Sequence, residues 1–297
     1  MKLTVLAAGA AFLLLGSAAA APTTTTKNKN NDSNDSDNAP DLDKIDYKCA
    51  GNINYQLINY LNTNSLNRTG ATCYKGNGDK SGYTAGIVNF STQYGDALGV
   101  ISLYAKDPTY NKEFDALIPT LQKYAQETSG SVEGLDKFCD AWESAANNGR
   151  AFYEIQVKYA RENYDKPAQL AARYPRLRFP ISKSVVFDTA VTNGLGDEGN
   201  SLGALIAATN STITADDSGD SGSTLAVGKF SIDEIKWLTK FLDIREEKSG
   251  DNGKGHIAAY RSLIDRKAYM FDGTIEFIDS NSKKIQISCN KAAESTS

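Results

Sequence analysis

Two aspartates stand out in residues 78–104, GDKSGYTAGIVNFSTQYGDALGVISLY. Asp79 lies between two glycines, and Asp96 directly follows Gly95. Because glycine permits tight turns, we expect Asp79 on a rigid, exposed turn, which is how many enzymes present a general base. A turn aspartate or a helix N-cap explains the same spacing, and the residues alone leave both interpretations open.

Other catalytic chemistry has little support in the residue types. The chain has a single histidine, His256, and no C-x-x-C motif. A zinc site or a Ser-His-Asp triad would depend on that one histidine, around which no motif is found. We therefore expect His256 to be a surface or helix residue, and we expect no metal or other cofactor.

Four cysteines indicate two disulfides if the protein folds in an oxidising compartment. They are Cys49, Cys73, Cys139 and Cys289, and three pairings are possible. We predict that Cys49 pairs with Cys73, because the first helix and the turn before Asp79 should lie close together, and that almost no free thiol remains.

The composition is that of a secreted globular protein. Of 297 residues, 40% are hydrophobic, and 32 Lys+Arg against 36 Asp+Glu give a net charge of −4, which favours no binding to nucleic acid. Residues 1–21 have the three-part pattern of a signal peptide, residues 22–40 are predicted to be a disordered linker, and residues 41–290 form the folded domain. We expect a secreted monomer with no membrane segment.

From residue 41 onward the pattern is mainly helical. Apolar residues recur at intervals of three and four around residues 55–61, 114–124 and 135–142. Further helices are predicted to begin at Ser231, with Glu234 completing a capping box, and to cover residues 256–270. Residues 211–229 have no period and are predicted to form a loop, whereas 274–278 and 283–287 are predicted to form a hairpin.

The 78–104 segment resembles the signature of glycoside hydrolase family 46, the chitosanases. The resemblance continues through LDKFCDAWESAANNGRAFYEIQVKYA, FDTAVTNG and WLTKFLDIR, and covers about residues 47–288. It implies a mainly α, two-lobed, lysozyme-like α+β fold with a small C-terminal β-hairpin. It also implies endo-hydrolysis of chitosan, or of a related amino-sugar polysaccharide, with inversion of configuration.

The resemblance also implies roles for individual residues. Asp79 matches the family's general base, and Thr84 matches a threonine that helps to hold the attacking water. The residues expected to bind substrate are Asp96, Tyr83 and Ser81. A buried charge network that supports the acid is expected from Asp188, Arg245 and Arg261, although a fold-stabilising salt bridge explains Arg245 equally well.

Two positions depart from the family pattern. Asn62 stands where the family has its general acid, a glutamate, and Lys80-Ser81 stand where it has Gly-Arg. An amide cannot protonate a leaving group. Three interpretations follow: a glycosidase whose acid comes from elsewhere, such as Glu113, Glu143 or Glu154; a binding protein that has lost catalysis; or a lysozyme-like hydrolase of another polymer.

Overall fold

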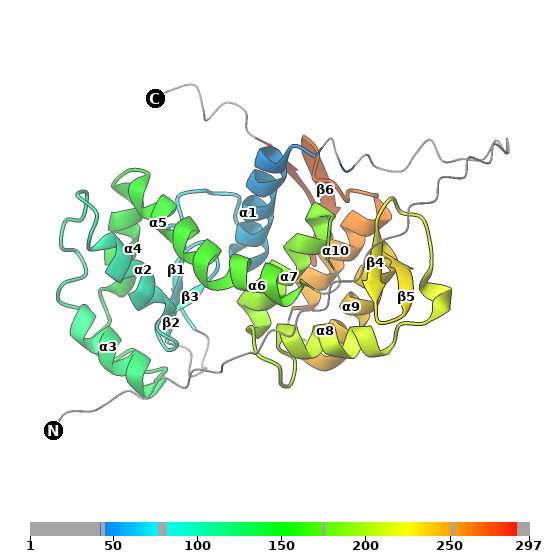
Figure 1. Cartoon of the computed structure of the whole chain (residues 1–297). Coiled ribbons are helices and arrows are strands. Elements are labelled where there is room, and N and C mark those ends of the chain that lie inside the picture. Colours follow the sequence, from blue (N-terminus) through cyan, green and yellow to red (C-terminus); the bar gives the residue numbers. More distant parts are fainter. Residues whose placement is uncertain (1–41, 43–44, 77–81, 174–175, 251–252, 290–297) are drawn as a thin grey trace, which may run out of the picture. The chain divides into compact units, whose positions relative to one another are not determined.

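The computed structural model describes residues 42, 45–76, 82–173, 176–250 and 253–289, which belong to one compact unit (Figure 1). The predicted signal peptide and linker lie outside the described residues. Within the described ranges, no helix has the length and apolar character needed to cross a membrane.

The described chain is mainly helical with three small antiparallel sheets, which confirms the predicted fold class. The helices are α1 (Tyr47–Thr63), α2 (Asp96–Tyr104), α3 (Ile118–Glu127), α4 (Phe138–Asn147), α5 (Ala151–Ala160), the π-helix η3 (Arg161–Asp165), α6 (Lys166–Ala171), α7 (Pro180–Asn193), α8 (Leu202–Ser211), the 3-10 helix η4 (Ala215–Asp217), α9 (Glu234–Ser249) and α10 (Lys254–Asp265). The strands are β1 (Cys73–Lys75), β2 (Tyr83–Ala85) and β3 (Phe90–Ser91) in one sheet, β4 (Thr224–Val227) with β5 (Phe230–Asp233), and β6 (Thr274–Ile278) with β7 (Lys284–Ser288).

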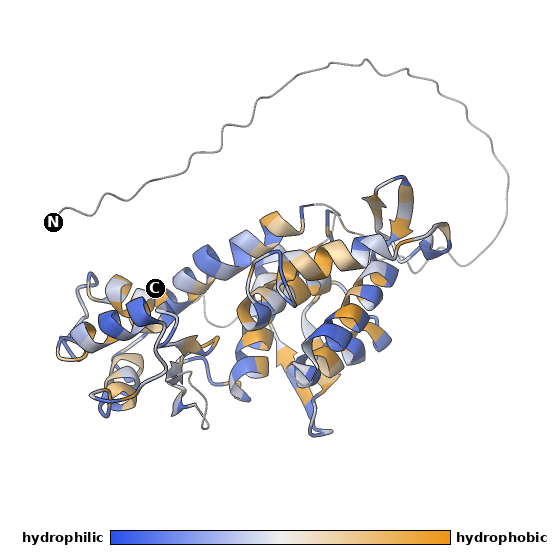
Figure 2. Cartoon of the chain, turned by 90° about the horizontal axis from the view of Figure 1, so that it is seen from below, coloured by the Kyte–Doolittle hydropathy of each residue, from blue (hydrophilic) through white to orange (hydrophobic). Residues whose placement is uncertain are grey.

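Two hydrophobic cores divide the unit into two lobes. The first lobe contains β1–β3 and α2–α5 around the fully buried Trp142. The second lobe contains the first half of α1, helices α6–α10 and the two later hairpins. Ile58 of α1 and Phe187 of α7 belong to the first core, although their neighbours on both helices belong to the second. Hydrophobic and hydrophilic residues alternate around the helix turns, as amphipathic packing requires (Figure 2).

Helix α1 confirms the helix predicted around residues 55–61. Asp46 caps its first turn by accepting hydrogen bonds from the backbone N–H groups of Lys48 and Cys49, at 3.1 and 3.0 Å. The helix ends at Asn64, which adopts the left-handed conformation with φ 54°. Asn62 is therefore held in the last turn.

The region before α9 corrects two predictions. Ser231 lies in β5 and does not cap a helix, because β5 pairs with β4 over residues that were predicted to form a loop. Asp233 is the N-cap of α9 and accepts from the backbone N–H groups of Ile235 and Lys236. The carboxylate of Glu234 is buried and accepts from the backbone N–H of Phe179 at 2.9 Å, so it is not free to complete a capping box.

The predicted Cys49–Cys73 disulfide is wrong. Cys73 at the start of β1 is bonded to Cys139 in α4, with 5.4 Å between their Cα atoms. Cys49 lies in the first turn of α1, about 20 Å along the helix from the end nearest the β1 sheet. Cys49 and Cys289 are unpaired, which corrects the expectation of two disulfides, although the two thiols are in hydrogen-bonding contact.

Thiol titration should therefore find two reactive groups in the denatured, unreduced protein. In the native protein we expect mainly Cys289 to react, because Cys49 is only 3% exposed, and burial together with the contact to Cys289 raises its pKa to about 11. Four thiols after denaturation would contradict the Cys73–Cys139 bond. A titration that finds no thiol would show that Cys49 and Cys289 are also oxidised.

Candidate active site

Strands β1 and β2 bracket the segment that contains Asp79. The backbone N–H of Gly76 donates to the carbonyl of Gly82 at 2.9 Å, which joins the two ends of that segment. Gly82 has φ 70°, and a Cβ there would overlap the hydroxyl of Thr92, so the position requires glycine. Asp79 and Ser81 themselves lie outside the described residues.

Thr84 occupies the middle strand of the first sheet. It pairs with Tyr74 of β1 and Ser91 of β3. Its hydroxyl oxygen, Oγ1, is buried and has no hydrogen-bond partner among the described residues. A buried hydroxyl without a protein partner is a site where a water molecule is expected.

Tyr83 points into the first lobe. Its ring packs against Phe138 with 5.5 Å between the ring centroids, and the residue is half-buried. Its aromatic face therefore contributes mainly to the core of this lobe, and the predicted contact with substrate is limited to the exposed part of the side chain.

Asn62 connects the end of α1 to the first sheet. Its side-chain amide donates to the carbonyl of Ile58 at 2.9 Å, and its own backbone carbonyl accepts from the side chain of Asn89, just before β3, at 2.6 Å. The last turn of α1 is therefore held against the sheet that carries Thr84. The side chain of Asn62 is an amide and has no acidic proton.

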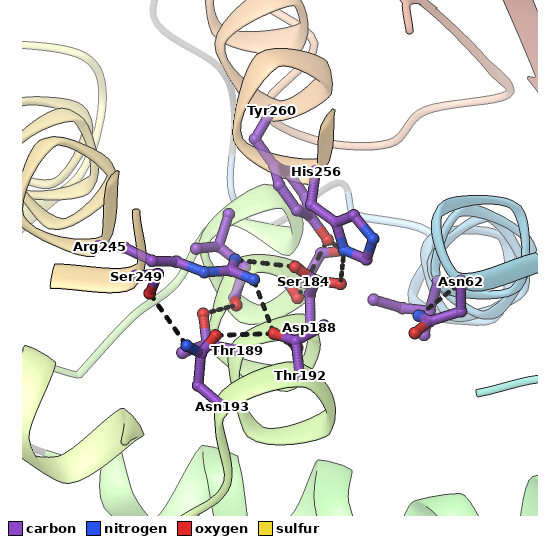
Figure 3. A network of polar contacts seen from close by, with 12 residues as sticks. Asn62, Ser184, Asp188, Thr189, Thr192, Asn193, Arg245, Ser249, His256 and Tyr260 are labelled. Carbon is purple, nitrogen blue, oxygen red and sulfur yellow. Dashed lines mark hydrogen bonds and ion pairs between the residues drawn. The ribbon is translucent and has the colours of Figure 1, made fainter. Parts of the chain in front are cut away.

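A buried charge network lies beside this end of α1 (Figure 3). Asp188 of α7 accepts from Arg245 of α9 at 2.8 Å, and both side chains are fully buried. Nδ1 of His256, in the first turn of α10, lies 2.8 Å from the other carboxylate oxygen of Asp188. Arg245 also donates to the hydroxyl of Thr192. Burial alone would raise the pKa of Asp188, but the charges and hydrogen bonds of His256 and Arg245 hold it below its usual value.

The third member of this network is not the predicted one. Arg261 pairs with Asp243 and Glu246 of α9, at 2.7 Å each, and remains 42% exposed. His256 takes its place; it lies in helix α10, as one of the two expectations had it, but its side chain is only 17% exposed and is part of the network. The sequence feature that indicates an inward-facing His256 is the helical period. His256, Tyr260 and Leu263 lie on one face of α10, and the last two are fully buried.

Asp96 begins α2 and turns inward. It accepts from the hydroxyl of Tyr164 in η3 and from the backbone of Ser91. Burial nevertheless raises its pKa, and the hydrogen bonds offset only part of that effect. The carboxylate predicted to bind substrate is therefore also a buried contact between α2 and η3.

Replacing Asp96 by Asn should change how stability depends on pH. A raised pKa means that the folded state holds the proton more tightly, so the carboxyl stabilises most below its unfolded pKa of about 3.9, and that stability is lost as pH rises through the folded pKa. Urea unfolding should show Asp96→Asn gaining stability relative to the unmodified protein as pH rises from about 3 to about 7.

Asp107→Asn provides a control with the opposite sign. Hydrogen bonds from Thr109 lower the pKa of Asp107, so this variant should lose relative stability over the same range. Parallel curves for the two variants would contradict the assignment of Asp96.

The glutamates named in the sequence analysis as alternative acids, Glu113, Glu143 and Glu154, lie in the first lobe. Glu143 on α4 and Glu154 on α5 are exposed, and Glu154 pairs with Arg150 on its own helix. Glu113 follows α2 and accepts from the backbone of Asn111. None contacts Asn62, Thr84 or His256 within the described part of the chain.

A pocket of about 220 Å³ opens where α1 ends, α10 begins and β6 turns into β7. Tyr60, Leu61 and Asn64 line it from α1, His256 from α10, and Asp279 from the turn. The hydroxyl of Tyr60 donates to Asp279 at 2.7 Å. The pocket therefore joins the end of α1 to the histidine of the charge network.

Comparison with known proteins agrees with this arrangement. The family model described as glycosyl hydrolase family 46 matches residues 56–278. A chitosanase from Bacillus subtilis (strain 168) is 36% identical over 167 residues, and this alignment spans 56% of each protein, or about half the length of that relative.

Solved structures match over most of the described chain. The native chitosanase from Bacillus subtilis MY002 is 27% identical, with a TM-score of 0.69 over 82% of this chain and 99% of that one. A mutant of the same enzyme complexed with 6 GlcN is 28% identical, with the same TM-score and coverage. The chitosanase from Gynuella sunshinyii, complexed with chitotetraose, is 23% identical with a TM-score of 0.68, over 80% of this chain and 97% of that one, and supports the fold alone.

Proposed function

Because the chain belongs to glycosyl hydrolase family 46, we propose that it is a secreted endo-hydrolase that cleaves chitosan, the β-1,4-linked polymer of glucosamine, with inversion of configuration. Inversion requires an acid that protonates the leaving oxygen and a base that activates a water on the opposite face of the sugar. Asp79 is the base in this proposal, and Thr84 helps to hold the water.

The buried hydroxyl of Thr84 is the observation that carries this proposal. A hydroxyl that is buried without a partner among the described residues costs free energy unless a water or a ligand satisfies it. In this proposal, the water bound at Thr84 on β2, five residues after Asp79 in the sequence, is the one that the base activates.

Incubation of the purified protein with chitosan, following new reducing ends, tests the proposal directly. We expect a rapid fall in viscosity, which marks endo cleavage, and an initial product with the α-anomer by NMR. Binding without cleavage would support a non-catalytic protein. Lysis of bacterial walls with no effect on chitosan would support a lysozyme-like activity instead.

A binding-only protein is the second candidate, and Asn62 is the observation that favours it. If the natural chain lacks an acid, Asn62→Glu should raise chitosan cleavage by about 10²–10⁴-fold, the usual contribution of a general acid. Asn62→Gln is the matched control, because it lengthens the side chain equally but adds no acidic proton. An active natural protein that is unchanged by Asn62→Glu would show that its acid lies elsewhere.

A further inference from the structure

His256 is one of the titratable side chains that the structure places beside the end of α1, with Tyr60 and Asp279. Its Nδ1 lies 2.8 Å from Oδ1 of Asp188, which leaves Nε2 as the ring nitrogen that Asp188 does not hold. The side chain is 17% exposed and lines the pocket shared by α1, α10 and the β6–β7 turn. Figure 3 shows Asn62 extending from α1 toward the same cluster, on the side where His256 lies.

We propose that His256, oriented by Asp188, is the proton donor for the leaving glycosidic oxygen. This inference rests on the proposed function. It explains how a chain with an amide at Asn62 can still hydrolyse a glycoside. The dyad has the required parts: a fully buried carboxylate that fixes the ring, and a second ring nitrogen, not held by Asp188, on a side chain that lines the pocket.

The step balances as follows. The Nε2–H of the imidazolium donates its proton to the glycosidic oxygen while the bond from that oxygen to C1 breaks. Water forms the new bond to C1 and gives its proton to the base proposed above. The departing sugar leaves with a hydroxyl, His256 is left neutral, and exchange of protons with solvent restores both groups. Asp188 accepts from Nδ1–H throughout and does not change charge.

The other charged or titratable groups around His256 are less suited to donate. Asp279, across the pocket, accepts from Tyr60 and from the backbone N–H groups of Asn281 and Lys283, and the first of these contacts lowers its pKa most. Tyr260, on the same helix, is fully buried and bonded to Ser184.

Arg245 stays protonated and donates to Asp188 and Thr192. On the α1 side, the residues lining the pocket are Tyr60, Leu61 and Asn64, none of which carries a charge. Among these groups, His256 combines a place in the lining of the pocket with a ring nitrogen that Asp188 does not hold.

Two substrates that differ in whether the leaving group needs a proton distinguish a proton donor from a residue with a structural role. His256→Gln keeps a side-chain amide that can donate to Asp188 but removes the acid. Chitosan hydrolysis should fall by about 10²–10⁴-fold, whereas a dinitrophenyl β-glycoside of a glucosamine oligomer, which needs no protonation, should lose less than about tenfold. Asn62→Glu added to His256→Gln should restore chitosan hydrolysis. Asp265→Asn, at the exposed end of the same helix as His256 and outside the lining of the pocket, is the control for local disturbance and should change neither rate.

A second measurement needs no variant. His256 is the only histidine in the chain, so diethyl pyrocarbonate should abolish chitosan hydrolysis and spare the aryl glycoside, and hydroxylamine should reverse the loss. Equal loss on both substrates, or no loss on chitosan, would overturn the role of His256. If the unmodified protein cleaves neither substrate, the proposed function itself fails, which is a different result.

Discussion

Asp79→Asn is expected to reduce chitosan hydrolysis by at least about 10²–10⁴-fold while the protein stays folded. Asparagine keeps the shape of aspartate but cannot take a proton from the attacking water. The melting temperature should change little, because a carboxylate on the turn that the sequence predicts contributes modestly to stability. Initial rates from reducing ends, with thermal unfolding of the same samples, provide the measurement.

An exposed aspartate supplies the control for Asp79. Asp140 on α4 is paired only with Lys137 in a surface ion pair, so Asp140→Asn should keep both full activity and stability. If Asp79→Asn keeps most of its activity, the base is assigned to the wrong residue. If the variant unfolds, Asp79 has a structural role.

Arg245→Met is expected to lower the free energy of unfolding by about 3–5 kcal/mol, the usual cost of removing one partner of a buried ion pair. Methionine fills part of the space but leaves Asp188 fully buried, with only His256 to balance its charge. Thr192 also loses its donor from Arg245. Urea denaturation at neutral pH measures the loss.

Arg261→Met is the matched control for Arg245. Arg261 makes two ion pairs on the surface and stays 42% exposed, so its removal should cost only about 0–1 kcal/mol. Equal losses of unfolding free energy in the two variants would contradict the prediction that the buried ion pair of Arg245 contributes more to stability than the exposed ion pairs of Arg261.

The pH dependence provides a second check on Arg245. Because the network lowers the pKa of Asp188, its stabilisation is present above the unfolded pKa of about 3.9 and is lost as pH falls through the folded pKa. The difference between Arg245→Met and the unmodified protein should therefore shrink in acid.

Local patterns were sufficient to predict several elements. The apolar period in α1 and the alternation in residues 274–288 describe contacts between residues close in sequence, and both elements form as predicted. The predicted start of α9 was wrong because capping by Ser231 competes with pairing to β4, and the sequence near Ser231 does not show that partner strand.

The candidate site was predicted in part. The 78–104 segment and the later motifs suggested the family and, through it, a network of Asp188 and Arg245, and the structure pairs these two residues. The sequence could not show that the Asp96 carboxylate accepts a hydrogen bond from Tyr164, or that Arg261 forms its ion pairs with α9. Both outcomes depend on how helices pack, because a side chain on a helix can reach any neighbour that its face meets.

The sequence by itself determined the family, the mainly helical fold, the hairpin at residues 274–288 and the amide at Asn62. Each of these depends only on the identity of residues or on a periodicity among residues that are close in the sequence. Only the tertiary structure decided that Cys73 bonds Cys139, 66 residues away, and that His256 meets Asp188, 68 residues away. Contacts at such separations follow from the packing of two cores around α1 and α7. No local pattern records which side chains that packing brings together.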